Sequence, residues 1–459
     1  MNKPSSSLVV INIVGLTSSL LGEHTPNLNQ LISDGSIQPV KGVFPSVTTT
    51  AQASMVTGKM PNEHGIVGNG WYWDDLAEVK FWLQPDQLVQ APKVWERLKQ
   101  ANSEFTCSRL FWWNNMYGNV EFSVTPRPHY HADGLKEIGL YSSPSNLFQR
   151  LEAELGGFPF FNFWGPKANI LSSQWIAQAA ALEFKWHRPN LQFVYLPHLD
   201  YNLQRLGPED PAIWKDVQAI DEVAGQLVNR VKELGAEVLI VSEYGITQVS
   251  QPIHINRLLR EQGYLKLRNS ATWELLDMGA SRAFAVADHQ IAHIYIKNSE
   301  DIPRVAQLLE SCDDIETVLA ANDMQKVAIN HQRSGQLIAI AKSHAWFTYY
   351  YWLDESKAPD FARTVDIHRK PGYDPVELFL DPEIKFPRLK IARRVAQKKM
   401  GMRMLMDVIP LDATLVKGSH GRLASSLDEQ PVLISSLPGM VENASELTDV
   451  QQLISDFFS

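Results

Sequence analysis

The sequence predicts an α/β protein in which a parallel β-sheet carries helices on both faces. Short β-branched runs are followed by turn residues and then by helical patterns, the order expected when crossover helices join parallel strands. With 459 residues, 44% hydrophobic and 20% charged, the chain has the composition of a globular protein with a large core. We therefore expect one α/β core that carries an insertion.

The predicted strands are apolar runs, as expected for strands buried on both faces. They cover residues 8–14, 191–196, 238–242 and 431–434. Between them, residues 92–100 and 211–234 have apolar side chains at helical spacing. Because ligands of open α/β sheets bind beyond the carboxyl ends of the strands, the residues after Val14, Leu196 and Ser242 are the first candidates for chemistry.

The alternation of strands and helices stops between residues 247 and 414. Within that stretch residues 283–296 are the most strand-like, and no internal repeat or low-complexity tract is apparent. We interpret 247–414 as a cap inserted into a core made of residues 1–246 and 415–459.

Charge and cysteine content restrict the partners and the compartment. A formal net charge of −9 disfavours a nucleic-acid backbone as the main partner, since phosphates attract basic surfaces. Cys107 and Cys312 give neither a disulfide framework nor a paired-cysteine metal motif, which favours a reducing compartment. Polar residues interrupt the apolar run 8–21, so we interpret it as a strand and its loop, and no stretch has the ~20 apolar residues that span a bilayer. We expect a cytoplasmic protein without a membrane or nucleic-acid partner.

Residues 44–58 form a turn and a small-residue helix that closes at glycine, with Thr48 at the helix start. A hydroxyl there lies in the positive end of the helix dipole and beside free backbone N–H groups, which favours an alkoxide or a bound phosphate oxygen. The alternative is that Thr48 only caps the helix. This segment alone leaves both interpretations open.

The next segment, residues 59–70, contains Pro, His-Gly and Asn in a recognisable order. Together, residues 44–70 resemble the nucleophile helix and loop of the nucleotide pyrophosphatases/phosphodiesterases (type I phosphodiesterases) and of phosphonoacetate hydrolase, in the alkaline-phosphatase superfamily. The resemblance implies an alkaline-phosphatase-like parallel sheet flanked by helices. It also implies that Thr48 is the nucleophile, that Asn69 donates a hydrogen bond to a nonbridging oxygen, and that the ligand is a small phosphorylated or phosphonate compound.

That superfamily uses two zinc ions held by carboxylates and imidazoles, and three of the implied ligand positions lack such a donor in this chain, while at a fourth Glu243 replaces an aspartate and can still ligate with a longer reach. Val14 stands where an aspartate precedes glycine, Gln204 replaces the histidine four residues after Asp200, and Tyr244 replaces the histidine of a Ser-Asp-His-Gly element. Valine has no donor atom and a neutral amide is a poor zinc ligand. A tyrosine hydroxyl must first lose a proton of pKa ~10.

Asp200, Glu243 and His420 are the implied donors that remain. By the resemblance, Asp200 and His420 belong to one ion and Glu243 to the other, so neither ligand set is complete. Because zinc affinity depends on the number and type of donors, we expect at most one divalent metal, with zinc the first candidate.

Four further segments have both a structural and a functional interpretation. Residues 366–374 place carboxylates, His368 and Arg369 around a Pro-Gly turn, which is typical of a salt-bridged loop; the alternative is a substrate-binding loop that uses His368 and Arg369. Residues 288–293 put two histidines on a cap strand, where hydrogen-bonded structure is more common than metal binding. The aromatic runs 111–117 and 346–352 are typical of core packing, with stacking on a flat ligand as the alternative.

Two functional hypotheses follow. The first is a divergent phosphodiesterase or phosphonate hydrolase in which Thr48 attacks, Asn69 stabilises an oxyanion, and one metal is held by Asp200, Glu243 and His420. The second is a pseudoenzyme, a ligand-binding or assembly protein that keeps the pocket and has lost two-metal catalysis. Metal content and turnover of a generic phosphodiester discriminate between them.

Overall fold

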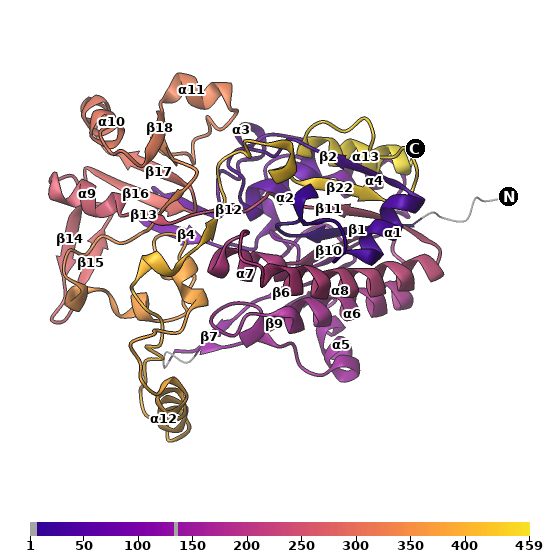
Figure 1. Ribbon diagram of the computed structural model, residues 1–459, viewed down its shortest axis with the longest axis horizontal. Coiled ribbons are helices and arrows are strands. Elements are labelled where there is room, and N and C mark those ends of the chain that lie inside the picture. Colours follow the sequence, from indigo (N-terminus) through magenta and orange to yellow (C-terminus); the bar gives the residue numbers. More distant parts are fainter. Residues whose placement is uncertain (1–6, 133–135) are drawn as a thin grey trace.

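The computed structural model describes residues 7–132 and 136–459, and this part of the chain is organised around an eight-stranded sheet (Figure 1). The strand order is β2-β22-β11-β1-β10-β5-β6-β9. The strands are β1 (Ser7–Ile13), β2 (Ser36–Pro39), β5 (Cys107–Leu110), β6 (Phe122–Pro126), β9 (Leu140–Ser143), β10 (Leu191–Leu196), β11 (Ala236–Val241) and β22 (Val432–Ser435). The predicted strands at 8–14, 191–196 and 238–242 are β1, β10 and β11.

The centre of the sheet is parallel and its edges are mixed. Strands β11, β1, β10, β5 and β6 pair in parallel, whereas β22 runs antiparallel to β11 and β2, and β9 runs antiparallel to β6. The predicted strand at 431–434 lies in the sheet as β22, but its expected parallel direction was wrong. The segment before β22 lies at the carboxyl edge of the parallel strands, so β22 has to run back across the sheet.

Alternate residues of the central strands face two helical layers. Val9 and Ile11 pack into one apolar cluster, whereas Leu8 and Val10 pack into the cluster on the opposite face. This period of two is what a strand buried on both faces requires. Figure 1 shows the two layers on opposite sides of the sheet. The first contains α6 (Ile170–His187) and α8 (Ile213–Glu233), and the second contains α2 (Thr48–Thr57), α4 (Val94–Ala101) and α13 (Val450–Phe457).

Segments that carry predicted chemistry meet at the carboxyl edge of the parallel strands. β1 leads into Val14, β10 leads into α7 (His198–Leu206) with Asp200, and β11 leads through Ser242 to Glu243. Helix α2 begins at Thr48 and is followed by Gly58, whose φ of 65° is the left-handed conformation that commonly closes a helix. The topology thus gathers residues that are far apart in the sequence.

A second layered unit lies beside the core (Figure 1). Its antiparallel sheet has the order β16-β17-β19-β18. The elements are β16 (Ala283–Asp288), β17 (Ile291–Ile296), β18 (Ile315–Leu319), β19 (Leu337–Ala341), α9 (Ile255–Glu261), α10 (Ile302–Glu310) and α11 (Ala321–Lys326). β12 (Thr247–Gln248) pairs with β21 (Gly418–Ser419), so the chain passes between the two sheets at neighbouring points. In the part of the chain that the structure describes, no helix is long and apolar enough to cross a membrane.

The aromatic run 346–352 belongs to the interior of the cap. Trp346, Tyr349 and Trp352 are at most 1% exposed and share an apolar cluster with the cap sheet. In the run 111–117, Trp112 is equally buried, whereas Tyr117 is 60% exposed. Core packing is therefore the confirmed interpretation for most of these rings.

A buried ion cluster holds the loop at 366–378. Lys370 Nζ lies 2.7 Å from Asp374 Oδ2 and 2.7 Å from Glu377 Oε1, and all three side chains are nearly inaccessible. Glu377 Oε2 also accepts a hydrogen bond from Trp164 Nε1 at 2.7 Å. The predicted salt-bridged loop is thus present, and its ion pairs fix the position of the residues between them.

Candidate functional site

Thr48 is the first residue of α2 and is buried at the carboxyl edge of the sheet. Its Oγ1 lies 2.9 Å from the hydroxyl oxygen of Tyr244. Asn69 Oδ1, by contrast, accepts the free N–H of Thr49 at 3.1 Å, and the Thr50 hydroxyl donates to the Ile66 carbonyl at 3.1 Å. The interpretation of Thr48 as a simple cap was wrong, because Asn69 takes that role from outside the helix.

Asn69 connects α2 to the cap. Its backbone N–H donates to Asp288 Oδ2 at 2.8 Å, and its Nδ2 donates to Asp288 Oδ1 at 3.1 Å. Burial raises the pKa of Asp288 to about 7, and the two hydrogen bonds from Asn69 oppose that rise. The amide expected to meet a ligand oxygen therefore already donates to a carboxyl group at the end of β16.

Glu243 is fully buried and is bound by neutral amides. Its Oε1 accepts hydrogen bonds from Asn12 Nδ2 at 2.5 Å and from Gln52 Nε2 at 2.6 Å, while its Oε2 has no hydrogen-bond partner. Burial raises the pKa of Glu243 to about 8, more than the hydrogen bonds lower it. Val14 packs into the apolar cluster on the α6 and α8 face and supplies no donor to this region.

Asp200 is linked to the cap through Gln204. Asp200 Oδ2 accepts a hydrogen bond from Gln204 Nε2 at 2.7 Å, and Gln204 Oε1 accepts one from the Tyr373 hydroxyl at 2.9 Å. Asp200 Oδ1 has no hydrogen-bond partner and lies 3.9 Å from His420 Nε2. Burial raises the pKa of Asp200 to about 7, although the hydrogen bond from Gln204 and the nearby Tyr244 hydroxyl lower it.

Four aromatic rings from separate segments form a continuous column, here called the ring stack: Tyr244, His420, His289 and Tyr373. The ring centroids are 3.7 Å apart from Tyr244 to His420, 3.6 Å from His420 to His289 and 3.7 Å from His289 to Tyr373. None of the four side chains is more than 4% exposed. Tyr244 and His420 occupy implied metal-ligand positions, one from each ion, so the ring stack joins the two positions by face contact.

The histidines of the ring stack are held neutral. His420 Nδ1–H donates to the Ser46 carbonyl at 2.8 Å, and burial lowers the pKa of His420 to about 3 against the effect of that hydrogen bond. Burial and the neighbouring His420 lower the pKa of His289 well below its usual value. The centre of the site therefore contains neutral rings at physiological pH.

This donor set does not fit a pair of zinc ions. Within residues 7–132 and 136–459, no group of three or more His, Cys, Asp and Glu side chains is arranged to hold a metal ion. His420 Nε2 and Asp200 Oδ1 face each other at 3.9 Å, which gives two donors where zinc usually takes four. Asp200, Glu243 and His420 lie in one region, but the structure does not assemble them as a metal-binding group, because amides and rings lie against them.

The loop at 366–374 reaches the site through Tyr373, which the sequence did not single out. His368 Nδ1 lies 3.3 Å from the Phe81 carbonyl, and Arg369 is more than half exposed with its Nε 3.4 Å from Asp366 Oδ2. Gly372 precedes Tyr373, and a Cβ at this glycine would lie 2.6 Å from the Tyr349 Cβ. The Pro-Gly turn therefore allows the close approach that brings Tyr373 into the ring stack.

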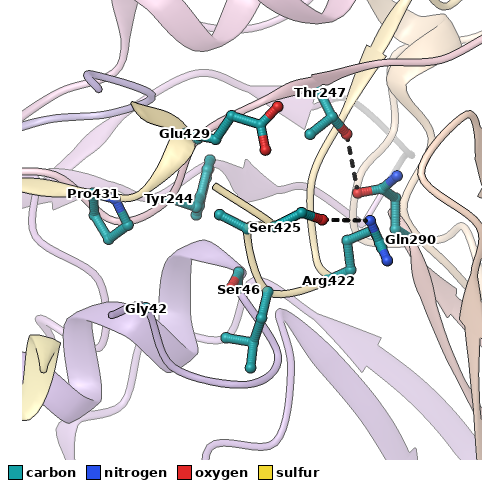
Figure 2. Close-up of a pocket in the computed structure, with 12 residues that line it drawn as sticks. Gly42, Ser46, Tyr244, Thr247, Gln290, Arg422, Ser425, Glu429 and Pro431 are labelled. Carbon is teal, nitrogen blue, oxygen red and sulfur yellow. Dashed lines mark hydrogen bonds between the residues drawn. The ribbon is translucent and has the colours of Figure 1, made fainter. Parts of the chain in front are cut away.

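A surface pocket borders the site at Tyr244 (Figure 2). Its lining also includes Ser46, Thr247, Gln290 and Arg422. Because Tyr244 lines this pocket and also contacts Thr48, it is the side chain that connects the buried site with the surface.

The parallel sheet, the helix that begins at Thr48, and the strand-end positions of Asp200, Glu243 and His420 define an alkaline-phosphatase-like α/β protein. The chain belongs to the type I phosphodiesterase/nucleotide pyrophosphatase family, whose sequence profile matches residues 8–374. The expected family and fold class are thus confirmed.

Curated relatives are distant in sequence. The chain is 24% identical over 299 residues to an uncharacterized pyrophosphatase/phosphodiesterase of Schizosaccharomyces pombe, a match that covers 64% of this chain and 55% of the relative. It is 25% identical over 264 residues to bis(5'-adenosyl)-triphosphatase ENPP4 of Bos taurus, which covers 54% of this chain and 49% of the relative. These matches span about half the length of the relatives.

Solved structures share the fold over almost the whole chain. Murine ectonucleotide pyrophosphatase/phosphodiesterase 5 has a TM-score of 0.59 at 14% identity, with 99% of this chain and 95% of that chain covered. Phosphonoacetate hydrolase from Sinorhizobium meliloti, in complex with phosphonoformate, has a TM-score of 0.62 at 12% identity, with 98% and 96% covered. At these identities the comparison establishes the fold.

Proposed function

We propose that this protein is a divergent, metal-independent member of its family that binds a small phosphorylated or phosphonate ligand near Thr48 without two-metal phosphoryl transfer. The ring stack is the observation that carries this proposal. It places Tyr244 in face contact with His420, and Tyr373 with His289, in the region to which the family pattern assigns metal ligands. In function the protein is then a pseudoenzyme.

The protonation of the buried carboxyl groups supports an anionic ligand in this setting. The pKa values of Asp200, Glu243 and Asp288 rise to about 7, 8 and 7 through burial, so at pH 7 Glu243 is mostly protonated and Asp200 and Asp288 are protonated in about half of the molecules. Protonated carboxyl groups donate hydrogen bonds and do not repel a phosphate. The amino-terminal end of α2 contributes a favourable dipole for the same kind of ligand.

A second candidate function is favoured by one specific contact. Thr48 Oγ1 and the Tyr244 hydroxyl are 2.9 Å apart, and Asp200 is close enough to Tyr244 for each group to shift the pKa of the other. This chain can pass the Thr48 proton to Tyr244 while Tyr244 passes its own proton to an ionised Asp200. A base with a pKa of about 7 suits such a transfer. The second candidate is thus a metal-independent transferase or hydrolase with Thr48 as nucleophile.

One set of measurements separates these functions. Protein purified without chelator is analysed for bound metals and assayed with bis(p-nitrophenyl) phosphate, and binding of AMP and phosphonoacetate is followed by calorimetry. We expect no stoichiometric metal, no turnover and measurable binding of one of the two ligands. Stoichiometric metal together with turnover would overturn the proposal, and so would the failure of both ligands to bind.

Variants of the nucleophile helix test the second candidate. Turnover that persists in chelator and disappears in Thr48→Ala and Tyr244→Phe would establish metal-independent catalysis. Thr50→Ala is the matched control, because Thr50 lies on the same helix and its hydroxyl donates to the Ile66 carbonyl. Equal loss of turnover in that control would indicate damage to α2 and would remove support for this relay.

A further inference from the structure

A strongly basic segment in the cap takes no part in the function proposed above. The basic segment comprises residues 385–403. It contains Lys385, Arg388, Lys390, Arg393, Arg394, Lys398, Lys399 and Arg403, with no acidic residue between Glu383 and Asp407. The chain as a whole has a net charge of −9, so this segment is opposite in sign to the rest of the molecule. A local concentration of one charge sign on a surface attracts a partner of the other sign.

The basic segment projects from the body of the protein. Its helix α12 (Pro387–Lys399) has no buried residue, and Figure 1 shows it apart from both sheets. A hydrogen bond from the Asp381 N–H to the Val408 carbonyl, 2.9 Å, closes the base of the projection. Lys390 Nζ and Arg394 Nη2 pair with Asp407 at 3.1 Å and 2.9 Å and tie the helix to the returning chain. In residues 7–132 and 136–459 the other six cations form no ion pair.

The outward face of α12 is apolar as well as basic. Phe386, Leu389 and Met400 are 71%, 69% and 65% exposed. Leu389, Ala392, Ala396 and Met400 recur at helical spacing on one exposed face, with Arg388, Arg393 and Lys399 beside them. Large apolar side chains interleaved with cations on an exposed helix are typical of segments that lie in the membrane interface.

We propose that the basic segment binds the surface of a bilayer that contains anionic phospholipid, with α12 lying in the plane of the interface. The cations would meet the lipid phosphates and carboxylates, and Phe386, Leu389 and Met400 would enter the acyl boundary. A nucleic-acid backbone matches the charge but offers no apolar region for these three side chains. The expectation of no membrane partner concerned segments that span the bilayer, whereas a helix that lies in the interface needs no run of ~20 apolar residues.

Vesicle flotation with the full chain tests this inference. We expect the protein to float with vesicles of phosphatidylcholine and phosphatidylserine and not with vesicles of phosphatidylcholine alone. Each cation near an anionic surface strengthens binding about fivefold, so removal of four should weaken partitioning by about 600-fold. The charge variant combines Arg388→Gln, Arg393→Gln, Lys398→Gln and Lys399→Gln. The control variant removes four exposed lysines elsewhere, Lys185→Gln, Lys215→Gln, Lys232→Gln and Lys342→Gln, and should differ from the parent by only a few-fold.

The apolar contribution has its own test. A variant with Phe386→Ser and Leu389→Ser should also partition less, and the deficit should persist in high salt, which screens the charges but not the apolar contact. Far-UV circular dichroism and the unfolding midpoint should match the parent, because these side chains are exposed. The inference is overturned if neither vesicle binds the protein, if the charge variant and control variant bind alike, or if a duplex DNA fragment binds and anionic vesicles do not.

Discussion

Replacement of Glu243 by glutamine should make the protein more stable at alkaline pH. Glu243 Oε1 accepts hydrogen bonds from Asn12 and Gln52, and a glutamine carbonyl can accept the same two. The substitution therefore keeps the shape and these hydrogen bonds while it removes the ionisable proton. Because the pKa of Glu243 rises from 4.5 to about 8 in the folded protein, ionisation of this group costs about 5 kcal/mol of stability.

The direction of the pH dependence follows from that pKa. The folded state holds the Glu243 proton more tightly than the unfolded chain does. Its contribution to stability is therefore complete below about pH 4.5 and is lost as the pH rises through about 8. Asp288, whose pKa is also raised, acts in the same direction in both proteins and cancels in the comparison, whereas the charge of Asp200 is part of what raises the Glu243 pKa and so belongs to the difference. We expect similar stability of parent and Glu243→Gln at about pH 5, and an advantage of up to about 5 kcal/mol for the variant at about pH 9.

Urea unfolding at a series of pH values, with chelator present, measures this difference. A parent protein whose stability relative to Glu243→Gln is constant or increases from about pH 5 to about pH 9 would refute the reasoning. A cation bound to Glu243 would produce that increase, because a nearby positive charge lowers a carboxyl pKa. Repeating the series with added zinc therefore shows directly whether the carboxyl group responds as a metal ligand.

Three further outcomes are expected. A variant that combines Val14→Asp, Gln204→His and Tyr244→His should bind zinc, because it supplies the donors that the family pattern places at these positions. Elemental analysis measures the zinc content, and a content equal to that of the parent would reject the assignment of these positions. Lys370→Met should lower the free energy of unfolding by about 3–5 kcal/mol in urea, because it leaves buried carboxylates without a cation, whereas exposed Lys342→Met should have little effect. Tyr373→Phe should cost about 1–3 kcal/mol in the same assay, because the buried Gln204 carbonyl loses its donor, whereas Tyr349→Phe, whose hydroxyl has no hydrogen-bond partner, should be nearly neutral.

The predicted strands and helices with strong periodicity are present in the structure. β1, β10 and β11 were predictable because each is a continuous apolar run buried on both faces. β5, β6 and β9 were not predicted, because their four or five residues mix polar and apolar side chains and are too few to show a period, whereas the equally short β22 is almost wholly apolar. The direction of β22 also could not be predicted, since a strand has the same composition whichever way it runs.

The residues of the candidate site were likewise predictable only in part. Thr48, Asp200, Glu243 and His420 were identifiable because each follows a recognisable motif near a strand or helix end. His289 lies in a segment that was interpreted either as hydrogen-bonded structure or as a metal site. Neither interpretation predicted that its ring stacks on the ring of His420. Long-range contacts between single side chains have no signature in local spacing.

By itself, the sequence determined the α/β class, the family, the position of Thr48 at a helix start, and the departures from the family pattern at Val14, Gln204 and Tyr244. These are local properties, because burial pattern, helix capping and donor chemistry depend on residue type and short spacing. Only the tertiary structure decided what surrounds these positions, since the ring stack combines Tyr244 and His420 with His289 and Tyr373 from distant segments. Stacking and carboxyl burial depend on how those segments pack, which residue order alone does not specify.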